Sequence, residues 1–280
     1  MVELVCFTLP YRLETFERAL QGIRQAGYDS VGFGLPHKDG GYPAEPTLAE
    51  AERIGRLLEK YSLRPRILYG ARTQAGTVEE LCAWVDFSVA LGKPAMVWVG
   101  VSGYRRFPSE PLPAAEYQAA HQAFVAKMRE VGAYAQEKGV TITLKPHTGN
   151  TATGPILAAT LREIGSPAVR ACLDPGNVAY YEGISPEEDI AAVIDQVELL
   201  TMKDHRGPRA HPDFPVPGEG DVDFVRILRD LKAAGFNGAL LVERVDGTDG
   251  SNLSAEEIDR RIAAARENVL KMAREAGYAV

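Results

Sequence analysis

Cysteine is scarce in this chain of 280 residues, and the three cysteines that are present lie far apart. Cys6, Cys82 and Cys172 are odd in number and match no spacing typical of a zinc site or a disulfide framework. Cys6 and Cys172 fall in apolar runs that predict strands, where a reduced cysteine is a small core residue. The cysteines therefore predict neither a disulfide-stabilised fold nor a zinc cluster.

The chain also lacks an excess of positive charge and any long hydrophobic run. Lysine and arginine number 31 against 38 acidic residues, a formal net charge of −7. Nucleic-acid binding normally needs a basic face, so this balance is unfavourable for it. No window is apolar over the length of a membrane span, and the first residues lack the basic and apolar segments of a signal peptide. We therefore expect no nucleic-acid partner, no membrane partner and a cytoplasmic location.

Short apolar runs alternate with longer amphipathic segments along the whole chain. The predicted strands are 3–9, 30–35, 66–69, 95–100, 141–146, 169–173, 199–203 and 239–243. The predicted helices are 13–26, 47–61, 77–91, 114–138, 156–164, 186–196, 224–234 and 255–276. A strand followed by a helix, repeated in this way, predicts a closed parallel (β/α)8 TIM barrel, and the chain length suits that fold.

The residues at the predicted boundaries agree with this pattern. Capping-box patterns stand at four helix starts: Thr47-x-x-Glu50, Thr77-x-x-Glu80, Ser185-x-x-Glu188 and Ser254-x-x-Glu257. Glycines follow most helical runs, where a left-handed residue is favoured. No glycine-rich or charged linker divides the chain, so we expect a single domain over 1–280. A doubly wound sheet uses the same alternation, but the first predicted strand-to-helix turn, Thr8-Leu9-Pro10-Tyr11-Arg12, lacks its glycine-rich nucleotide loop.

Polar side chains gather at four of the predicted strand ends. Lys145 and His147 end the fifth strand, Asp174 the sixth, Lys203 and His205 the seventh, and Glu243 the eighth. Side chains alternate between the two faces of a strand. If Thr143, Cys172, Thr201 and Leu241 line the barrel interior, then Lys145, Asp174, Lys203 and Glu243 also point inward, one layer higher. In such barrels this end carries the active site, so we expect an acid–base site here.

These strand ends also carry a family resemblance. Leu-Lys-Pro-His at 144–147, Leu-Asp-Pro-Gly-Asn at 173–177, Met-Lys-Asp-His at 202–205 and Pro-Gly-Glu-Gly-Asp-Val-Asp-Phe at 217–224 resemble the xylose isomerase-like barrels. This group contains sugar and sugar-phosphate isomerases and epimerases, and the resemblance is most specific over 139–247. It implies a divalent metal ion, often Mn²⁺, Mg²⁺, Co²⁺ or Zn²⁺, bound by strand-end carboxylates and histidine, and it leaves a homo-oligomer possible.

The resemblance implies a ligand set with departures from the family pattern. Asp174 and Glu243 match family ligand positions, and His147 and His205 would complete the set. The family usually has glutamate where this chain has Lys145, and often histidine where it has Thr201. Two histidines and two carboxylates suit Mn²⁺, Co²⁺, Fe²⁺ or Zn²⁺ better than Mg²⁺. Alternatively, the ammonium group of Lys145 takes the place of the metal ion, held between Asp174 and Glu243.

The resulting hypothesis is a metal-dependent sugar or sugar-phosphate isomerase or epimerase that transfers a proton next to a carbonyl. The predicted catalytic residues are Lys145, His147 and Glu243, and the predicted metal ligands are His147, Asp174, His205 and Glu243. The predicted substrate-binding residues are Asn177, Lys203 and Arg206. Alternatives are a lyase or C-glycoside-cleaving relative and a metal-free sugar-binding barrel. An endonuclease of the same barrel type is disfavoured by the few histidines and the acidic charge.

Overall fold

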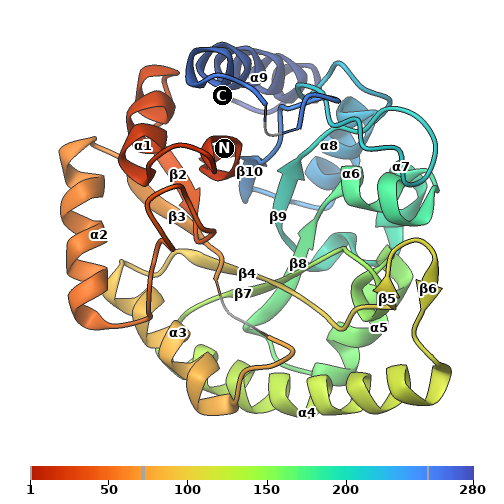
Figure 1. Cartoon of the computed structure of the whole chain (residues 1–280). Helices are drawn as coiled ribbons and strands as arrows, with labels where there is room; N and C mark the ends of the chain where they lie inside the picture. The colour runs from red at the N-terminus through yellow and green to blue at the C-terminus, as the bar shows by residue number, and fades with distance from the viewer. Residues whose placement is uncertain (1, 71–72, 251) are drawn as a thin grey trace.

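Eight parallel strands close into a barrel that helices surround (Figure 1). The computed structural model describes residues 2–70, 73–250 and 252–280. The barrel strands are β1 (Glu3–Phe7), β2 (Ser30–Phe33), β3 (Arg64–Leu68), β4 (Ala95–Val99), β7 (Ile142–Lys145), β8 (Val169–Leu173), β9 (Val197–Met202) and β10 (Ala239–Val242). Each strand pairs with the next one in the chain, and β10 pairs with β1 to close the barrel. The (β/α)8 barrel predicted from the sequence is confirmed.

The helices follow the strands in the expected alternation. Their bounds are α1 (Phe16–Gln25), α2 (Leu48–Lys60), α3 (Val78–Ala90), α4 (Ala114–Lys138), α5 (Gly154–Ile164), α6 (Pro175–Asn177), α7 (Pro186–Asp189), α8 (Phe224–Ala233) and α9 (Ala255–Glu275). Of the four predicted capping boxes, the one at α3 forms both reciprocal hydrogen bonds, between Thr77 and Glu80. At α2 and α9 the threonine or serine hydroxyl alone caps the helix, and the hydroxyl of Ser185 does not cap α7.

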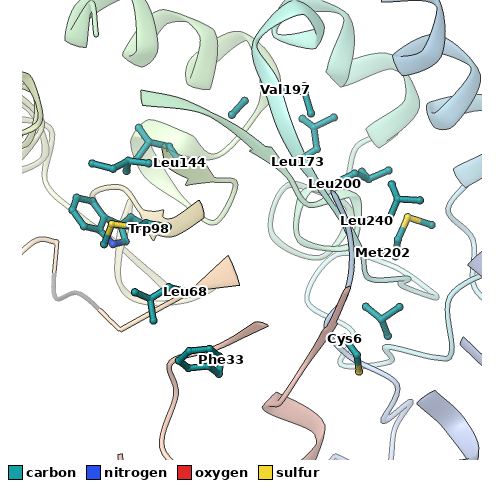
Figure 2. Close-up of a cluster of buried hydrophobic side chains, with 14 of the residues drawn as sticks. Cys6, Phe33, Leu68, Trp98, Leu144, Leu173, Val197, Leu200, Met202 and Leu240 are labelled. Atoms are coloured by element: carbon teal, nitrogen blue, oxygen red, sulfur yellow. The ribbon is translucent and has the colours of Figure 1, made fainter. Parts of the chain in front are cut away.

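Alternate strand residues build two apolar layers. Inward-facing side chains fill the barrel interior, among them Val5, Phe7, Val97, Cys172 and Leu241. Outward-facing residues pack against the helices, and Figure 2 labels Phe33, Leu68, Trp98, Leu144, Leu173, Leu200, Met202 and Leu240 among them. The inward positions of Cys172 and Leu241 confirm the register assumed from the sequence, which places the polar strand ends above the interior layer.

Two segments differ from the sequence-based expectation. The predicted helix over 186–196 is wrong in its extent, because α7 ends at Asp189 and shorter 3-10 turns continue to Gln196. Val193 leaves the helical region with φ −130° and ψ 1°, and the Asp189 carboxylate accepts a hydrogen bond from the Gly154 backbone at 2.6 Å. A small hairpin, β5 (Tyr104–Arg106) and β6 (Glu110–Pro111), was not predicted, since it is short and exposed.

None of the helices in the described part of the chain combines the length and apolar character needed to cross a membrane.

Candidate functional site

Four adjacent strands bring the site together at the carboxyl end of the barrel. Lys145 is the last residue of β7, and Asp174, Lys203 and Glu243 each follow directly after β8, β9 and β10. These strands are consecutive neighbours in the sheet, so their ends lie side by side (Figure 1). All four residues are at most 5% exposed. The convergence expected from strand alternation is therefore what the fold produces.

Two lysines share two carboxylates in this buried cluster. The Lys145 Nζ lies 2.8 Å from Asp174 Oδ2 and also makes an ion pair with Glu243. The Lys203 Nζ lies 3.4 Å from the same Asp174 oxygen and 3.4 Å from Glu243 Oε1. The Tyr69 hydroxyl donates a hydrogen bond to Glu243 Oε2 at 3.0 Å. The cluster thus balances two positive charges against two negative charges, as buried ions require.

Burial and neighbouring charge shift the pKa values of this cluster in different directions. Burial alone would raise the pKa of Glu243, but the ammonium groups of Lys145 and Lys203 outweigh it and hold that pKa at about 2. Burial would lower the pKa of Lys145, yet Asp174 and Glu243 raise it well above its ordinary value. For Lys203 burial prevails, with the charges of Lys145 and Arg244 adding to it, so its pKa is lowered. Glu243 is consequently a firmly ionised carboxylate and Lys145 a fixed cation.

The turn after β8 holds Lys203 in place. The Asp174 carboxylate accepts a hydrogen bond from the Asn177 backbone at 2.9 Å and so caps α6. The Asn177 side chain donates to the Pro146 carbonyl at 2.7 Å and accepts from Lys203 Nζ at 2.5 Å. Asn177, predicted to bind substrate, is thereby engaged with protein groups on both sides of its amide and orients the lysine.

His147 forms a pair with a tyrosine that the sequence did not single out. The Tyr181 hydroxyl lies 2.7 Å from His147 Nε2, and the rings are 4.2 Å apart. Burial, together with the charges of Lys145 and Lys203, lowers the pKa of His147 to about 4, so its imidazole is neutral at pH 7. Tyr181 lies in a short helical turn beyond α6. Strand alternation therefore does not predict where its side chain points. Tyr69, in contrast, follows β3 in an inward register, a signal that alternation does provide.

The predicted metal ligands are not gathered around one point. His205 Nε2 lies 2.9 Å from the carbonyl oxygen of His211, in the loop after β9, and His147 faces Tyr181. The carboxylates of Asp174 and Glu243 are contacted by ammonium groups. Among residues 2–70, 73–250 and 252–280, no three histidine, cysteine, aspartate or glutamate side chains are placed to share a metal ion. A donor set whose carboxylates already hold two cations does not fit a divalent ion, because the like charges would repel it.

Arg206 also lies apart from the cluster. Its guanidinium is 3.2 Å from Asp213 and donates to the Glu219 carbonyl, on an exposed part of the loop after β9. Arg206 is predicted from the sequence to bind substrate and lies three residues beyond Lys203. At that point, however, the chain has already left the mouth of the barrel.

A cleft of about 960 Å³ opens above the cluster. Lys145, His147, Tyr181, Lys203 and Glu243 all line it. Its size is at the upper end of the range, roughly 300–1,000 Å³, found for small-molecule sites. The cluster is therefore accessible to a small molecule even though its side chains are almost fully covered.

Comparison with known families identifies this architecture. The sequence pattern of the family described as "Xylose isomerase-like TIM barrel" matches residues 20–269. The chain belongs to this family. The match spans most of the barrel, so the resemblance seen in the strand-end motifs extends beyond residues 139–247. A search of curated protein sequences gives no significant match.

Solved structures share the family's fold at low sequence identity. A xylose isomerase domain protein from Alicyclobacillus acidocaldarius is 20% identical with a TM-score of 0.73, covering 99% of this chain and 100% of that one. D-allulose 3-epimerase from Methylomonas sp., in complex with D-allulose, is 22% identical with a TM-score of 0.70 and 97% coverage of both chains. D-psicose 3-epimerase from Clostridium cellulolyticum H10, with D-tagatose, is 13% identical with a TM-score of 0.75, covering 97% and 99%. At these identities the likeness is one of fold.

Proposed function

We propose that this protein is an isomerase or epimerase that moves a proton next to the carbonyl group of a sugar-like compound. The observation that carries the proposal is the pair of ammonium groups, Lys145 and Lys203, held by Asp174 and Glu243 on the floor of the cleft. Membership of the xylose isomerase-like family supports it, and so does the fold shared with structures named as sugar epimerases.

The two lysines supply the positive charge that the reaction needs. Removing a proton from the carbon next to a carbonyl leaves negative charge on the carbonyl oxygen. Fixed cations in a site shielded from water stabilise that charge without having to reorganise. Asp174 and Glu243 hold the amines in position, and the scheme requires no metal ion. The catalytic role of Glu243 is then to place Lys145, because a carboxylate with a pKa of about 2 is a weak base.

Proton transfer falls to the pair of Tyr181 and His147. The Tyr181 oxygen takes the proton from the substrate carbon while its own proton passes to His147 Nε2 across the 2.7 Å hydrogen bond. The C–H bond breaks, its electron pair forms the carbon–carbon double bond, and the carbonyl oxygen becomes the enediolate oxygen. That negative charge raises the pKa of His147 and so makes the imidazole a better acceptor as the reaction proceeds. Return of the proton to the former carbonyl carbon, together with transfer of the adjacent hydroxyl proton to the enediolate oxygen, moves the carbonyl to the next carbon and completes the isomerisation.

The proposal is tested by hydrogen exchange from substrate carbon into deuterated water. A panel of ketoses and aldoses is incubated with the enzyme before and after treatment with a chelator, and exchange is followed by NMR. We expect exchange with at least one sugar, unaffected by the chelator, and a loss of roughly a hundredfold or more in Lys145→Met. Lys271→Met, on the exposed side of α9, is the matched control and keeps full exchange.

One result would overturn the metal-free scheme, and another would overturn the enzymatic function itself. Exchange that is abolished by the chelator and restored by Mn²⁺, Co²⁺ or Zn²⁺ would instead establish a metal-dependent enzyme. Binding of sugars without any exchange would establish a sugar-binding barrel.

A further inference from the structure

The cleft has two chemically different halves. The β7–β10 side carries Lys145, Lys203 and Glu243. The strand ends on the opposite side, β1 to β4, instead present Leu9, Leu35, Tyr69 and Val99 to the same cleft. The halves meet where Val99 of β4 pairs with Lys145 of β7.

Three of these uncharged residues pack on top of the apolar side chains that fill the barrel interior. Leu9, Leu35 and Tyr69 are partly buried and pack on the interior layer of Phe7, Val97 and their neighbours. The Phe7 and Tyr69 rings are 4.5 Å apart. Among the described residues, apolar side chains of the barrel core therefore face the cleft on this side, whereas ion pairs line it on the other.

The described part of the wall above this surface carries two aromatic side chains that pack against neighbouring residues. Tyr42, in the loop after β2, stacks on Phe16 of α1 with the rings 4.6 Å apart and 11° from parallel. Trp84 of α3 lies against Gly70, where an added Cβ would come within 2.7 Å of the indole ring. The acid on this side, Glu80, directs its carboxylate to the Thr77 backbone at 2.8 Å and so serves the helix cap.

A single sugar bound on the charged half would leave the apolar half of the cleft exposed to water. Hydroxyl groups match the charged half, which offers the ion-paired groups of Lys145, Lys203 and Glu243. A cleft of about 960 Å³ is large enough for a drug-sized ligand. Covering an apolar surface lowers the free energy of the complex only when the covering group is itself apolar. The aromatic rings of Tyr42, Tyr69 and Trp84 favour a planar group in this position.

We propose that the substrate is a sugar-like carbonyl compound bearing an aromatic substituent, with the sugar on the Lys145–Lys203 side and the ring against Leu9, Leu35 and Tyr69. This inference rests on the proposed function and names its substrate class. The ring anchors the molecule, and this binding energy positions the carbon that loses the proton.

Paired ligands test the idea by calorimetry. For each of glucose, galactose and allose, the phenyl and the methyl glycoside share the same sugar and differ only in carrying a phenyl or a methyl group. Neither has a free carbonyl group, so neither can react by the proposed route. We expect at least one phenyl glycoside to bind about tenfold or more tightly than its methyl partner. In Leu35→Gln, which places an amide on the apolar surface, that ratio falls toward one. Leu48→Gln, an exposed leucine of α2 outside the cleft, is the matched control and keeps the wild-type ratio. Thermal unfolding of both variants checks that they are folded.

The outcomes separate this inference from the proposed function. Equal affinities within every pair, an absence of binding by every glycoside, or a ratio unchanged by Leu35→Gln overturns the aromatic subsite. The proton-transfer role is tested separately with Lys145→Met. If that variant keeps both the phenyl preference and full exchange activity, the proposed chemistry fails while the subsite stands.

Discussion

Lys145 and Lys203 contact the same two carboxylates but differ in their surroundings. Lys145 lies closer to both acids, and its pKa is raised, whereas burial and the nearby cations lower the pKa of Lys203. Removal of one member of such a network leaves an uncompensated buried charge. The four residues therefore act as a unit, and a loss of activity in any single variant has to be read together with its stability.

The lowered pKa of His147, about 4, makes the stability of the folded protein depend on pH. A histidine whose pKa is lower in the folded protein binds its proton more readily when unfolded. Its contribution is complete above about pH 7 and is lost as the pH falls from 6.5 toward 4. We expect His147→Gln to have a flatter dependence of unfolding free energy on pH across this window. The difference is at most about 3 kcal/mol, from about 1.4 kcal/mol per pKa unit.

Urea unfolding of the wild type and His147→Gln at pH 7, 6, 5 and 4 measures this difference. His37 and His205, whose pKa values are also lowered by burial, remain in both proteins and cancel in the comparison. Parallel curves over the whole range would contradict the prediction.

At the scale of elements, one carboxylate organises the long loop after β9. Asp204 is fully buried and accepts hydrogen bonds from the backbone N–H groups of His205, Gly218, Gly220 and Val222, at 2.8 to 3.2 Å. An added Cβ on Gly220 would come within 2.2 Å of this carboxylate, so the loop needs glycine there. The aspartate of the Met-Lys-Asp-His motif thus shapes the loop that directs Arg206 away from the barrel mouth.

The helix caps yield a matched pair of variants at this scale. Thr77 forms the complete capping box of α3, whereas the Ser185 hydroxyl bonds only to the Glu187 side chain. We expect Thr77→Ala to lower the free energy of unfolding by about 1 kcal/mol, because it removes a cap from a backbone N–H. We expect Ser185→Ala to change it by less than about half as much. Chemical denaturation measures both, and an equal loss in the two variants would show that sequence pattern, not cap geometry, sets the effect.

At the scale of the whole molecule, the barrel interior supports the site from below. Leu241 is fully buried in this layer, two residues before Glu243. We expect Leu241→Ala to cost about 2–5 kcal/mol of unfolding free energy, since strands on all sides limit collapse into the cavity. Leu48→Ala, at a side chain 69% exposed, is expected to change stability by no more than about 0.5 kcal/mol. Urea midpoints that coincide for the two variants would contradict a packed interior.

The sequence determined the barrel architecture and which strand ends carry the candidate site. Strand and helix periods are local properties, and the inward positions of Cys172 and Leu241 fixed the direction of Asp174 and Glu243 by simple alternation. Closure of the barrel then had to bring these strand ends together. The ammonium of Lys145 between two carboxylates followed from the same register, as one of two arrangements left open.

Only the tertiary structure decided which polar atoms meet. His205 lies two residues beyond Lys203, yet the loop held by Asp204 turns its imidazole to the His211 carbonyl. Tyr181 reaches His147 from a turn without a strand's period, and the apolar half of the cleft combines loops distant in sequence. Loop paths and side-chain partners depend on contacts between remote segments, which local patterns do not encode, whereas the closing of eight strands follows from those patterns.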